Sequence, residues 1–405
     1  MVEGDSRSGN PRLLVLGAGP AQLGLLEAAR DRGLWVAVVD RDPAAPGFRF
    51  ADRRCILSTE DEPAIERLIT ALEIDGIISP GTDWPVGVAA RVAERSGLPH
   101  PIEPATAVLA TNKLRQRERL AEAEVPQPRW WVVGGEDRPP DVSGPVVVKA
   151  PDRQGQKGLT LVEDPAELPD AIERARAAAR NGLALVEELV EGPEVTVVGI
   201  SAAGAFTALA VTDRVVAEQP AFGVALAHVW PSEVSDTLEV SDTVSEALAA
   251  LGIVNGPSYT QLRIGPDGPQ VIEVAARLGG GHDAELVQAV TGVDLNGLTI
   301  DAAVGAELVL TQHEHRVGGA VTKFLVAPPG VLQRTEVPDD LVGIQQVRIY
   351  REPGYVHTPL RRGADRAGAL LAVGDSRAEA LARANAAADR IRFVTADAGS
   401  LREAI

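Results

Sequence analysis

A lysine and a glycine-rich loop stand close together near the middle of the chain. Lys149 ends a run of valines that is predicted to form a strand, and residues 152–158 read Asp-Arg-Gln-Gly-Gln-Lys-Gly. Glycines let backbone N–H groups approach phosphate oxygens, and a lysine fixed beside them adds positive charge. The pattern favours a polyphosphate ligand, although a strand-end lysine followed by a plain hairpin connection is the alternative. The loop residues expected to contact such a ligand are Arg153, Gln154, Gly155, Gln156, Lys157 and Gly158.

An acidic pair, Glu187 and Glu188, interrupts an apolar run that is predicted to be a strand. A buried carboxylate is unfavourable unless hydrogen-bond donors surround it. The amino group of an adenine or the hydroxyls of a ribose would supply such donors. Solvated glutamates on an edge strand are the alternative.

A hairpin is predicted over residues 259–274. If its turn is centred on Asp267, Gln261 and Glu273 are equally far from the turn and stand opposite each other on one face. One amide and one carboxylate oxygen, together with water and phosphate, suit Mg²⁺. Arg277 follows Glu273 closely and could neutralise charge on a transferring phosphoryl group. A cross-strand hydrogen bond beside a surface arginine is the alternative.

Two of the six histidines, His228 and His282, stand near glycines or prolines in the sequence. Either side chain could contact a substrate or a phosphate. A hydrogen-bonded structural role is the alternative for each of them.

A glycine-rich turn near the N-terminus reads Gly-Ala-Gly-Pro-Ala-Gln over residues 17–22, and Asp40 ends the next predicted strand. Dinucleotide sites place a pyrophosphate on such a turn and a ribose on such a carboxylate. However, Gln22 replaces the third glycine, which normally allows close packing of helix and strand. A structural turn is therefore favoured, and an NAD-dependent oxidoreductase is kept as an alternative.

The elements that would position these residues fall into successive parts. After a polar leader at residues 1–10, which is predicted to be disordered, strands alternate with helices up to about residue 104. This alternation predicts a parallel, doubly wound sheet with strands at residues 13–16, 35–39 and 76–79. A small α/β module at about residues 125–190 holds the glycine-rich loop between two strands. From residue 318, short strands and a last helix at residues 377–393 indicate a separate C-terminal lobe.

The composition limits the classes of protein to consider. With 405 residues the chain is too long for one ordinary core, and its net charge of −18 disfavours a nucleic-acid partner. The single cysteine, Cys55, cannot form an internal disulfide. No apolar run approaches the roughly 20 residues that cross a bilayer, and no secretory signal is apparent. We therefore expect a cytoplasmic enzyme without a membrane partner.

Taken in order, these residues resemble the ATP-grasp superfamily over nearly the whole chain. The resemblance implies an α/β protein in three parts: a Rossmann-like pre-ATP-grasp parallel sheet at 11–104, a two-lobed α+β ATP-grasp module at 105–317, and a small C-terminal lobe at 318–405. The sequence is most similar to carboxylate-amine ligases such as bacterial L-amino-acid ligases. Carbamoyl-phosphate synthetase, biotin carboxylase and aminoimidazole-ribonucleotide carboxylase enzymes are more distant relatives.

The same resemblance assigns the nucleotide-binding residues. Lys113 and Lys149 would contact the phosphates of ATP, and residues 152–158 would close over them as a lid. Glu187 and the backbone of Val190 would bind adenine beside Glu188, while Glu194 would bind the ribose.

The resemblance also assigns the metal and substrate residues. Gln261 and Glu273 match the ligands of Mg²⁺, for which Mn²⁺ could substitute, and Arg277 matches the arginine that steadies the γ-phosphate and the acyl phosphate. His228 falls where related ligases carry a histidine that faces the active site. Many members of the superfamily have an asparagine at the position of Ala275. Amino-acid ligases, like this chain, tend to have Ala-Ala-Arg at residues 275–277. The substrate pocket is expected to include Trp84, Gly280, Gly281, His282 and Asp283.

The activity implied is ATP-dependent ligation of a carboxylate to an amine. ATP would phosphorylate the carboxylate, the amine would attack the acyl phosphate, and ADP and phosphate would leave. A bicarbonate-using carboxylase or carbamoyl-phosphate-type enzyme is the alternative within the superfamily, and a catalytically silent nucleotide-binding regulator is a further alternative. Both substrates would be small molecules, and a homodimer is the expected assembly if the enzyme is oligomeric.

Overall fold

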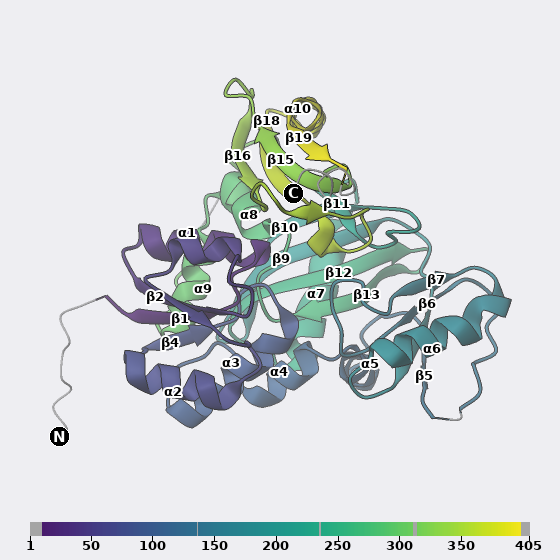
Figure 1. The fold of residues 1–405 in the computed structure, drawn as a ribbon. Helices are drawn as coiled ribbons and strands as arrows, with labels where there is room; N and C mark the ends of the chain where they lie inside the picture. Colours follow the sequence, from purple (N-terminus) through teal and green to yellow (C-terminus); the bar gives the residue numbers. More distant parts are fainter. Residues whose placement is uncertain (1–9, 136, 235, 311–313, 398–405) are drawn as a thin grey trace.

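The computed structural model describes residues 10–135, 137–234, 236–310 and 314–397 (Figure 1). Apart from residue 10, the expected leader lies outside the described residues. The N-terminal domain lies on one side of a central sheet, the small module at about residues 125–190, called the lid from here on, lies on the other, and the C-terminal strands lie above (Figure 1).

The N-terminal domain is a parallel sheet covered by helices, as the alternation of elements predicts. Its strands, in spatial order, are β3 (Arg53–Ile56), β2 (Trp35–Asp40), β1 (Arg12–Leu16) and β4 (Gly76–Ile78). Its helices are α1 (Leu23–Asp31), α2 (Glu62–Leu72) and α3 (Asp83–Ser96). After Arg12, strand β1 is apolar and buried, because helices cover both faces of a parallel sheet.

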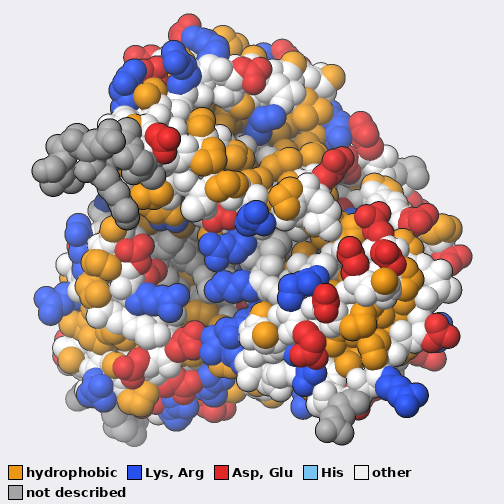
Figure 2. All heavy atoms as spheres, turned by 45° about the vertical axis from the view of Figure 1, so that its right-hand side comes forward, with side chains coloured by type: hydrophobic (Ala, Val, Ile, Leu, Met, Phe, Trp, Pro, Cys, Tyr) orange, Lys and Arg blue, Asp and Glu red, His pale blue; other side chains and the backbone are white. Residues whose placement is uncertain are grey.

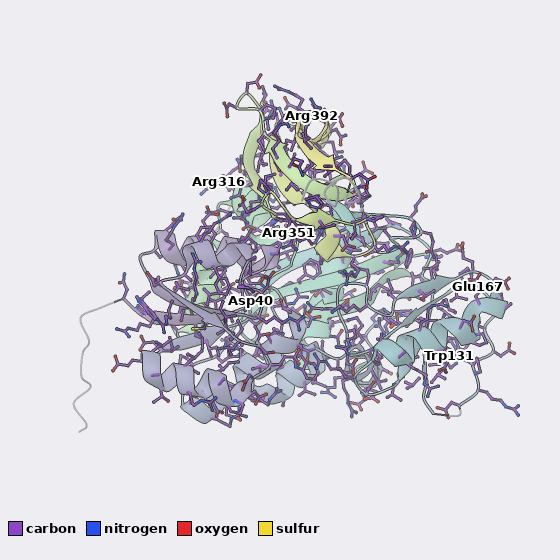
Figure 3. The ribbon with its side chains drawn as sticks, viewed as in Figure 1. Asp40, Trp131, Glu167, Arg316, Arg351 and Arg392 are labelled. Atoms are coloured by element: carbon purple, nitrogen blue, oxygen red, sulfur yellow. The ribbon has the colours of Figure 1, made fainter. Side chains whose placement is uncertain are left out.

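The lid follows two helices, α4 (Pro104–Ala110) and α5 (Lys113–Glu122). It is an antiparallel sheet, backed by α6 (Leu168–Ala178), with a hydrophobic core of its own. Its strands, in order, are β5 (Trp130–Val133), β8 (Ala184–Glu188), β6 (Val146–Lys149) and β7 (Thr160–Val162). Trp131 and Glu167 lie on this lobe, far from Asp40 at the end of β2 (Figure 3).

A large antiparallel sheet forms the centre of the molecule. Its strands, in spatial order, are β13 (Gly268–Ala275), β12 (Gly256–Gly265), β9 (Glu194–Ala202), β10 (Ala205–Val216), β11 (Ala225–Trp230), β14 (Gly319–Leu325), β18 (Gly368–Gly374) and β16 (Ile344–Ile349). The helices packed on it include α7 (Thr237–Leu251), α8 (Asp283–Thr291), α9 (Leu295–Ala303) and α10 (Arg377–Arg390). Since α9 also packs against α1 and β4, it joins the central sheet to the N-terminal domain.

The C-terminal residues are continuous with this central sheet. Strand β14 pairs with β11, so the lobe expected from residue 318 extends the sheet that carries the rest of the module. A small sheet of β17 (Val356–His357), β15 (Gly330–Glu336) and β19 (Arg392–Ala396) lies beside it. The last helix, α10 (Arg377–Arg390), is shorter than predicted, because Ile391 is extended and residues 392–396 form β19.

The expected α/β fold class with a Rossmann-like parallel sheet is confirmed. Within the described part of the chain, no helix is both long and apolar enough to cross a bilayer.

Candidate active site

The two predicted metal ligands, Gln261 and Glu273, lie opposite each other in the β12–β13 hairpin because the hairpin contains a β-bulge. Leu262 pairs with Val271, and the next pair is Gln261 with Glu273, so Ile272 is the extra residue. A regular ladder would have placed Ile272 opposite Gln261 and turned Glu273 to the other face. The bulge therefore brings the amide and the carboxylate to one face.

Both side chains line a cavity of about 190 Å³ between the central sheet and the lid. On the face of the molecule seen in Figure 2, Lys and Arg side chains gather around the central hollow, although the chain carries a net charge of −18. This local excess of cations suits a polyphosphate. The predicted site residues that line the cavity are Lys113, Lys149, Arg153, Gln154, Gly155, Gln156, Lys157, Glu187, Glu188, Val190, Glu194, Gln261, Glu273 and Arg277.

Lys149 is held by a buried ion cluster. Its Nζ lies 2.5 Å from Glu187 Oε2, while Arg117 Nε donates to Glu187 Oε1 at 2.7 Å. Burial lowers the pKa of Lys149. For Glu187, the neighbouring cations outweigh the effect of burial and lower the pKa of the carboxyl group. Both carboxylate oxygens thus have cationic partners, so the structure shows Glu187 orienting Lys149, and the expected adenine contact stays a prediction.

Lys113 lies beside the metal pair. Its Nζ is 2.7 Å from Glu273 Oε1, and the ammonium group lowers the pKa of Glu273 although burial acts to raise it. Gln261 Nε2 donates to the hydroxyl of Tyr259 at 3.1 Å, which leaves its carbonyl oxygen as the atom suited to a cation. An oxygen pair of this kind fits Mg²⁺ or Mn²⁺. The described residues contain no cluster of three or more potential ligands among His, Cys, Asp and Glu, so phosphate oxygens would have to complete the coordination.

Arg277 approaches the cavity from the end of the hairpin. Its guanidinium binds Asp83 Oδ1 at 2.5 Å, in the first turn of α3, and its Nη1 donates to the Leu278 carbonyl. The N-terminal domain thereby contributes a carboxylate to the part of the cavity where Arg277 lies.

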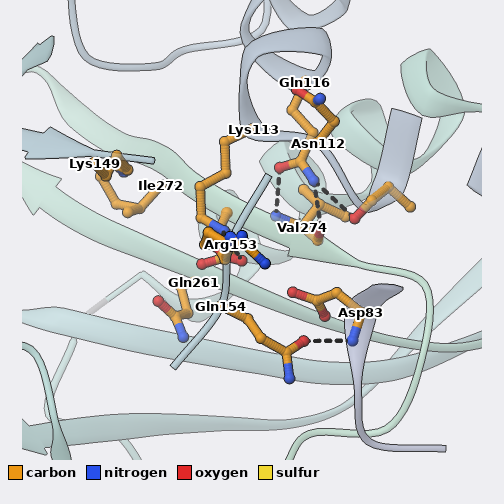
Figure 4. A network of polar contacts seen from close by, with 12 residues as sticks. Asp83, Asn112, Lys113, Gln116, Lys149, Arg153, Gln154, Gln261, Ile272 and Val274 are labelled. Carbon is orange, nitrogen blue, oxygen red and sulfur yellow. Dashed lines mark hydrogen bonds and ion pairs between the residues drawn. The ribbon is translucent and has the colours of Figure 1, made fainter. Parts of the chain in front are cut away.

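The glycine-rich loop lies closed against the rest of the molecule (Figure 4). The backbone N–H of Asp83 donates to Gln154 Oε1 at 2.5 Å, and Lys113 Nζ donates to the Arg153 carbonyl at 2.9 Å. Gln156 accepts a hydrogen bond from the Gly363 N–H of the C-terminal segment. The loop therefore contacts all three parts of the chain, and its role as a lid stays a prediction. Gly158 lies outside the cavity with a φ of +70°, and a Cβ there would come 2.8 Å from the Cβ of Ala178.

Glu194 lines the same cavity and lies between two arginines. Its carboxylate binds Arg214 Nη1 and lies 3.5 Å from Arg263 Nη2. Arg263 also donates to the Val190 carbonyl at 3.0 Å. This arrangement fixes a carboxylate at the position assigned to the ribose.

A second cavity, of about 440 Å³, lies between the N-terminal domain and the lid. It shares Asp83, Gln154 and other loop residues with the first cavity, so the two are contiguous. Trp84 lines it, with the guanidinium of Arg180 at 3.9 Å over its ring. Arg180 also forms a paired contact with Glu60 at 2.7 and 2.9 Å. The lid and the N-terminal domain thus meet around a polar pocket beside the first cavity.

Within the described structure, neither of these two cavities is lined by the predicted histidines, His228 and His282. His228 is buried with Nδ1 3.5 Å from Asp283 Oδ1, and its ring packs against Tyr259, which does line the cavity. His282 Nε2 lies 2.6 Å from the hydroxyl of Tyr350. The structural alternative fits His282, and His228 is separated from the cavity by one side chain.

Gly280 and Gly281, which precede His282 in the sequence, lie close to distant parts of the chain. A Cβ at Gly281 would come 2.9 Å from His228 Nε2, and one at Gly280 would lie 3.5 Å from the Cβ of Ala21. Gly280 and Gly281 thus lie at contacts between parts of the protein, and the substrate role of Gly280, Gly281 and Asp283 stays a prediction.

The N-terminal turn is occupied by its own side chains. Asp40 Oδ2 accepts a hydrogen bond from the Ala18 N–H at 2.8 Å, and Gln22 Nε2 donates to Thr82 Oγ1 at 3.0 Å. A Cβ at Gly17 would lie 3.0 Å from the Gln22 side chain. These contacts support the structural turn over a dinucleotide site.

Two residues of α5 escaped the sequence-based prediction although they support the site. Arg117 is 1% exposed and Gln116 is 2% exposed, and both bind the edge of β13. Their spacing after Lys113 places them on the inner face of a helix, but nothing in the sequence indicates which strand they contact.

Comparisons with known proteins agree with this geometry. Residues 142–285 match the ATP-grasp domain family, and residues 323–396 match the family "L-amino acid ligase C-terminal domain 2". The chain is therefore similar to ATP-grasp ligases, as predicted, and its C-terminal residues are similar to those of L-amino acid ligases.

Individual relatives cover almost the whole chain. The formate-dependent phosphoribosylglycinamide formyltransferase of Thioalkalivibrio sulfidiphilus is 28% identical over 95% of this chain and 96% of the relative. The crystal structure of the Bacillus licheniformis L-amino acid ligase has a TM-score of 0.80 at 21% identity, covering 96% of this chain and all of that one. A Hydrogenobacter thermophilus biotin carboxylase domain dimer, solved with MgADP and bicarbonate, has a TM-score of 0.78 at 18% identity, over 95% and 90% of the two chains.

Proposed function

We propose that this protein is an ATP-dependent carboxylate-amine ligase that forms an amide bond on amino-acid-like substrates. The observation that carries the proposal is the pairing of Gln261 with Glu273 beside Lys113, in the same cavity as Lys149 and Arg277. A metal-binding pair, two lysines and an arginine around one hollow are what phosphoryl transfer from ATP requires.

The protein's own groups would act mainly by position and charge. Lys113 and Lys149 would bind the phosphates, and Arg277 would neutralise the charge that develops on the transferred phosphoryl group. Gln261 and Glu273 would hold Mg²⁺, which supplies charge neutralisation and alignment of the phosphates. The carboxylate of the first substrate would attack the γ-phosphate of ATP, releasing ADP and leaving an acyl phosphate. The amine of the second substrate would then displace phosphate and form the amide.

The closed lid supports an acyl-phosphate route. An acyl phosphate is hydrolysed by water, so the reaction needs a site that excludes it. Contacts of Gln154 and Gln156 with the N-terminal and C-terminal parts close the loop over the cavity. The second cavity, next to the phosphate end, has room for the substrates.

The test is ADP release from ATP and Mg²⁺ with a panel of amino acids, offered singly and in pairs, with mass detection of the amide. We expect a pair to stimulate ADP release and to yield one amide for each ADP. Failure of every pair would overturn the ligase proposal. Stimulation by bicarbonate alone would instead favour the carboxylase or carbamoyl-phosphate alternative, which the bicarbonate bound by the Hydrogenobacter relative makes worth testing.

A cytoplasmic location and a homodimer belong to the same proposal. Sedimentation of the purified protein checks the second of these.

A further inference from the structure

Arg117 is a buried arginine that contacts two separate parts of the active site. It lies on α5, and its Nε donates to Glu187 Oε1 of the lid strand β8 at 2.7 Å. Its other nitrogens donate to the central sheet, where Nη1 reaches the Val271 carbonyl at 2.7 Å and Nη2 the Ile272 carbonyl at 2.6 Å. One guanidinium thus joins the lid to the hairpin that carries the metal pair.

The two carbonyls are those of the bulge. In a regular strand, consecutive carbonyls point to opposite sides, so they cannot both reach one group at the strand's edge. At Val271 and Ile272 they do, because the register shifts there. Strand β13 is the edge of the central sheet, so these oxygens would otherwise have no ladder partner.

The next residues of β13 are held by the same helix. Gln116 Nε2 donates to the Val274 carbonyl at 2.7 Å, and its Oε1 accepts from the Val274 N–H at 3.0 Å (Figure 4). The amide side chain therefore replaces a neighbouring strand, and Lys113 binds the Glu273 carboxylate between these two contacts. Helix α5 fixes the edge strand residue by residue.

We propose that Arg117 is a positioning residue for the metal pair and for Lys149. By binding both bulge carbonyls it keeps Glu273 on the face of Gln261, and by binding Glu187 it orients the carboxylate that holds Lys149. This inference rests on the proposed nucleotide site. An arginine is required because its planar fork presents donors in several directions, which one ammonium group cannot do.

The test uses Mn²⁺ and ADP as probes, so it does not depend on knowing the substrates. Mn²⁺ binding to the ADP-saturated protein is followed by electron paramagnetic resonance, and ADP binding in EDTA is measured by calorimetry. The variants are Arg117→Met and Arg117→Lys. The control is Arg119→Met, on the same helix, whose guanidinium is exposed and contacts Glu122 and the Ala250 carbonyl.

We expect Arg117→Met to weaken Mn²⁺ binding at least tenfold while ADP binding without metal weakens several-fold less. Arg117→Lys should fall between wild type and Arg117→Met, and Arg119→Met should match wild type. Unchanged Mn²⁺ affinity in Arg117→Met, or unchanged ADP affinity in the same variant, would overturn the inference. If Arg117→Met does not fold, Arg117→Lys decides by the same two measurements. Wild-type protein that binds no ADP would instead refute the proposed function itself.

Discussion

The ammonium group of Lys149 lies 2.5 Å from the carboxylate of Glu187, and neither side chain is more than 6% exposed. A buried ion pair loses hydration on both sides, so each charge depends on its partner. Arg117 binds the other oxygen of Glu187, so Glu187 depends less on Lys149 than Lys149 depends on Glu187.

This inequality predicts different effects for the two partners. Glu187→Gln leaves two buried cations without a counter-charge and should lower the free energy of unfolding by about 3–5 kcal/mol. Lys149→Met leaves Glu187 paired with Arg117 and should lower it by less, while weakening ATP binding. Urea denaturation and calorimetric titration with ATP measure the two quantities. Equal destabilisation by both variants would contradict the inequality.

Glu273→Gln should remove most of the Mg²⁺-dependent turnover. The carboxylate is paired with Lys113 and opposite Gln261, so its neutral amide would neither balance the ammonium group nor attract a divalent cation. We expect a loss of about 10²-fold or more in turnover, measured as ADP release over a series of Mg²⁺ concentrations. Gln270→Ala, on the same strand and outside the cavity, serves as the control. Full turnover in Glu273→Gln would exclude it as a metal ligand.

Arg180→Ala should loosen the lid. The side chain stacks on Trp84 and pairs with Glu60, and both partners belong to the N-terminal domain. Without these contacts the loop at residues 152–158 should be cut faster by protease, and more phosphate should be released per amide formed because water reaches the acyl phosphate. Arg176→Ala, on α6 and paired with Glu173, is the matched control. If both variants are cut at the wild-type rate, the contacts of Arg180 do not hold the loop closed.

Acid should destabilise the protein partly through His282. Burial lowers the pKa of this imidazole to about 4 from an ordinary 6.5, and Arg348 Nη1 donates to its Nδ1. Because the folded state resists protonation, this stability is present above pH 6.5 and is lost as the pH falls toward 4. The contribution is about 3 kcal/mol. Nuclear magnetic resonance titration of the ring should show it neutral at pH 6.

The stability difference can be measured with His282→Gln. This variant keeps polar atoms near Tyr350 and Glu285 but cannot titrate, so its unfolding free energy should vary less between pH 6.5 and 4 than that of wild type. The same slope in both proteins would show that other groups account for the acid sensitivity.

Much of the site could be predicted from the sequence because its residues are close together in the chain or stand on regular elements. The glycine-rich loop after Lys149 is local, and the pairing of Gln261 with Glu273 follows from counting outward from one turn. This pairing was predicted correctly, but the turn is not centred on Asp267 as the prediction assumed. The turn lies between Gly265 and Gly268, and the bulge corrects a register that would otherwise be one residue out.

The remaining features depend on contacts between distant parts of the sequence. Arg117 binds carbonyl groups more than 150 residues away, and no local pattern indicates them. The partners of Glu187 could not be predicted either, because a buried carboxylate can be hydrogen-bonded by a ligand or paired with the protein's own cations. The extent of the central sheet was missed because the pairing of β14 with β11 joins segments that resemble two separate lobes.

That pairing makes the protein hard to divide. If the chain were cut before Gly319, β11 would present a free row of N–H and C=O groups along its length in place of its contact with β14. Such an edge is a template for strands of other molecules, so the shortened protein should self-associate. The C-terminal segment therefore protects the catalytic sheet from aggregation.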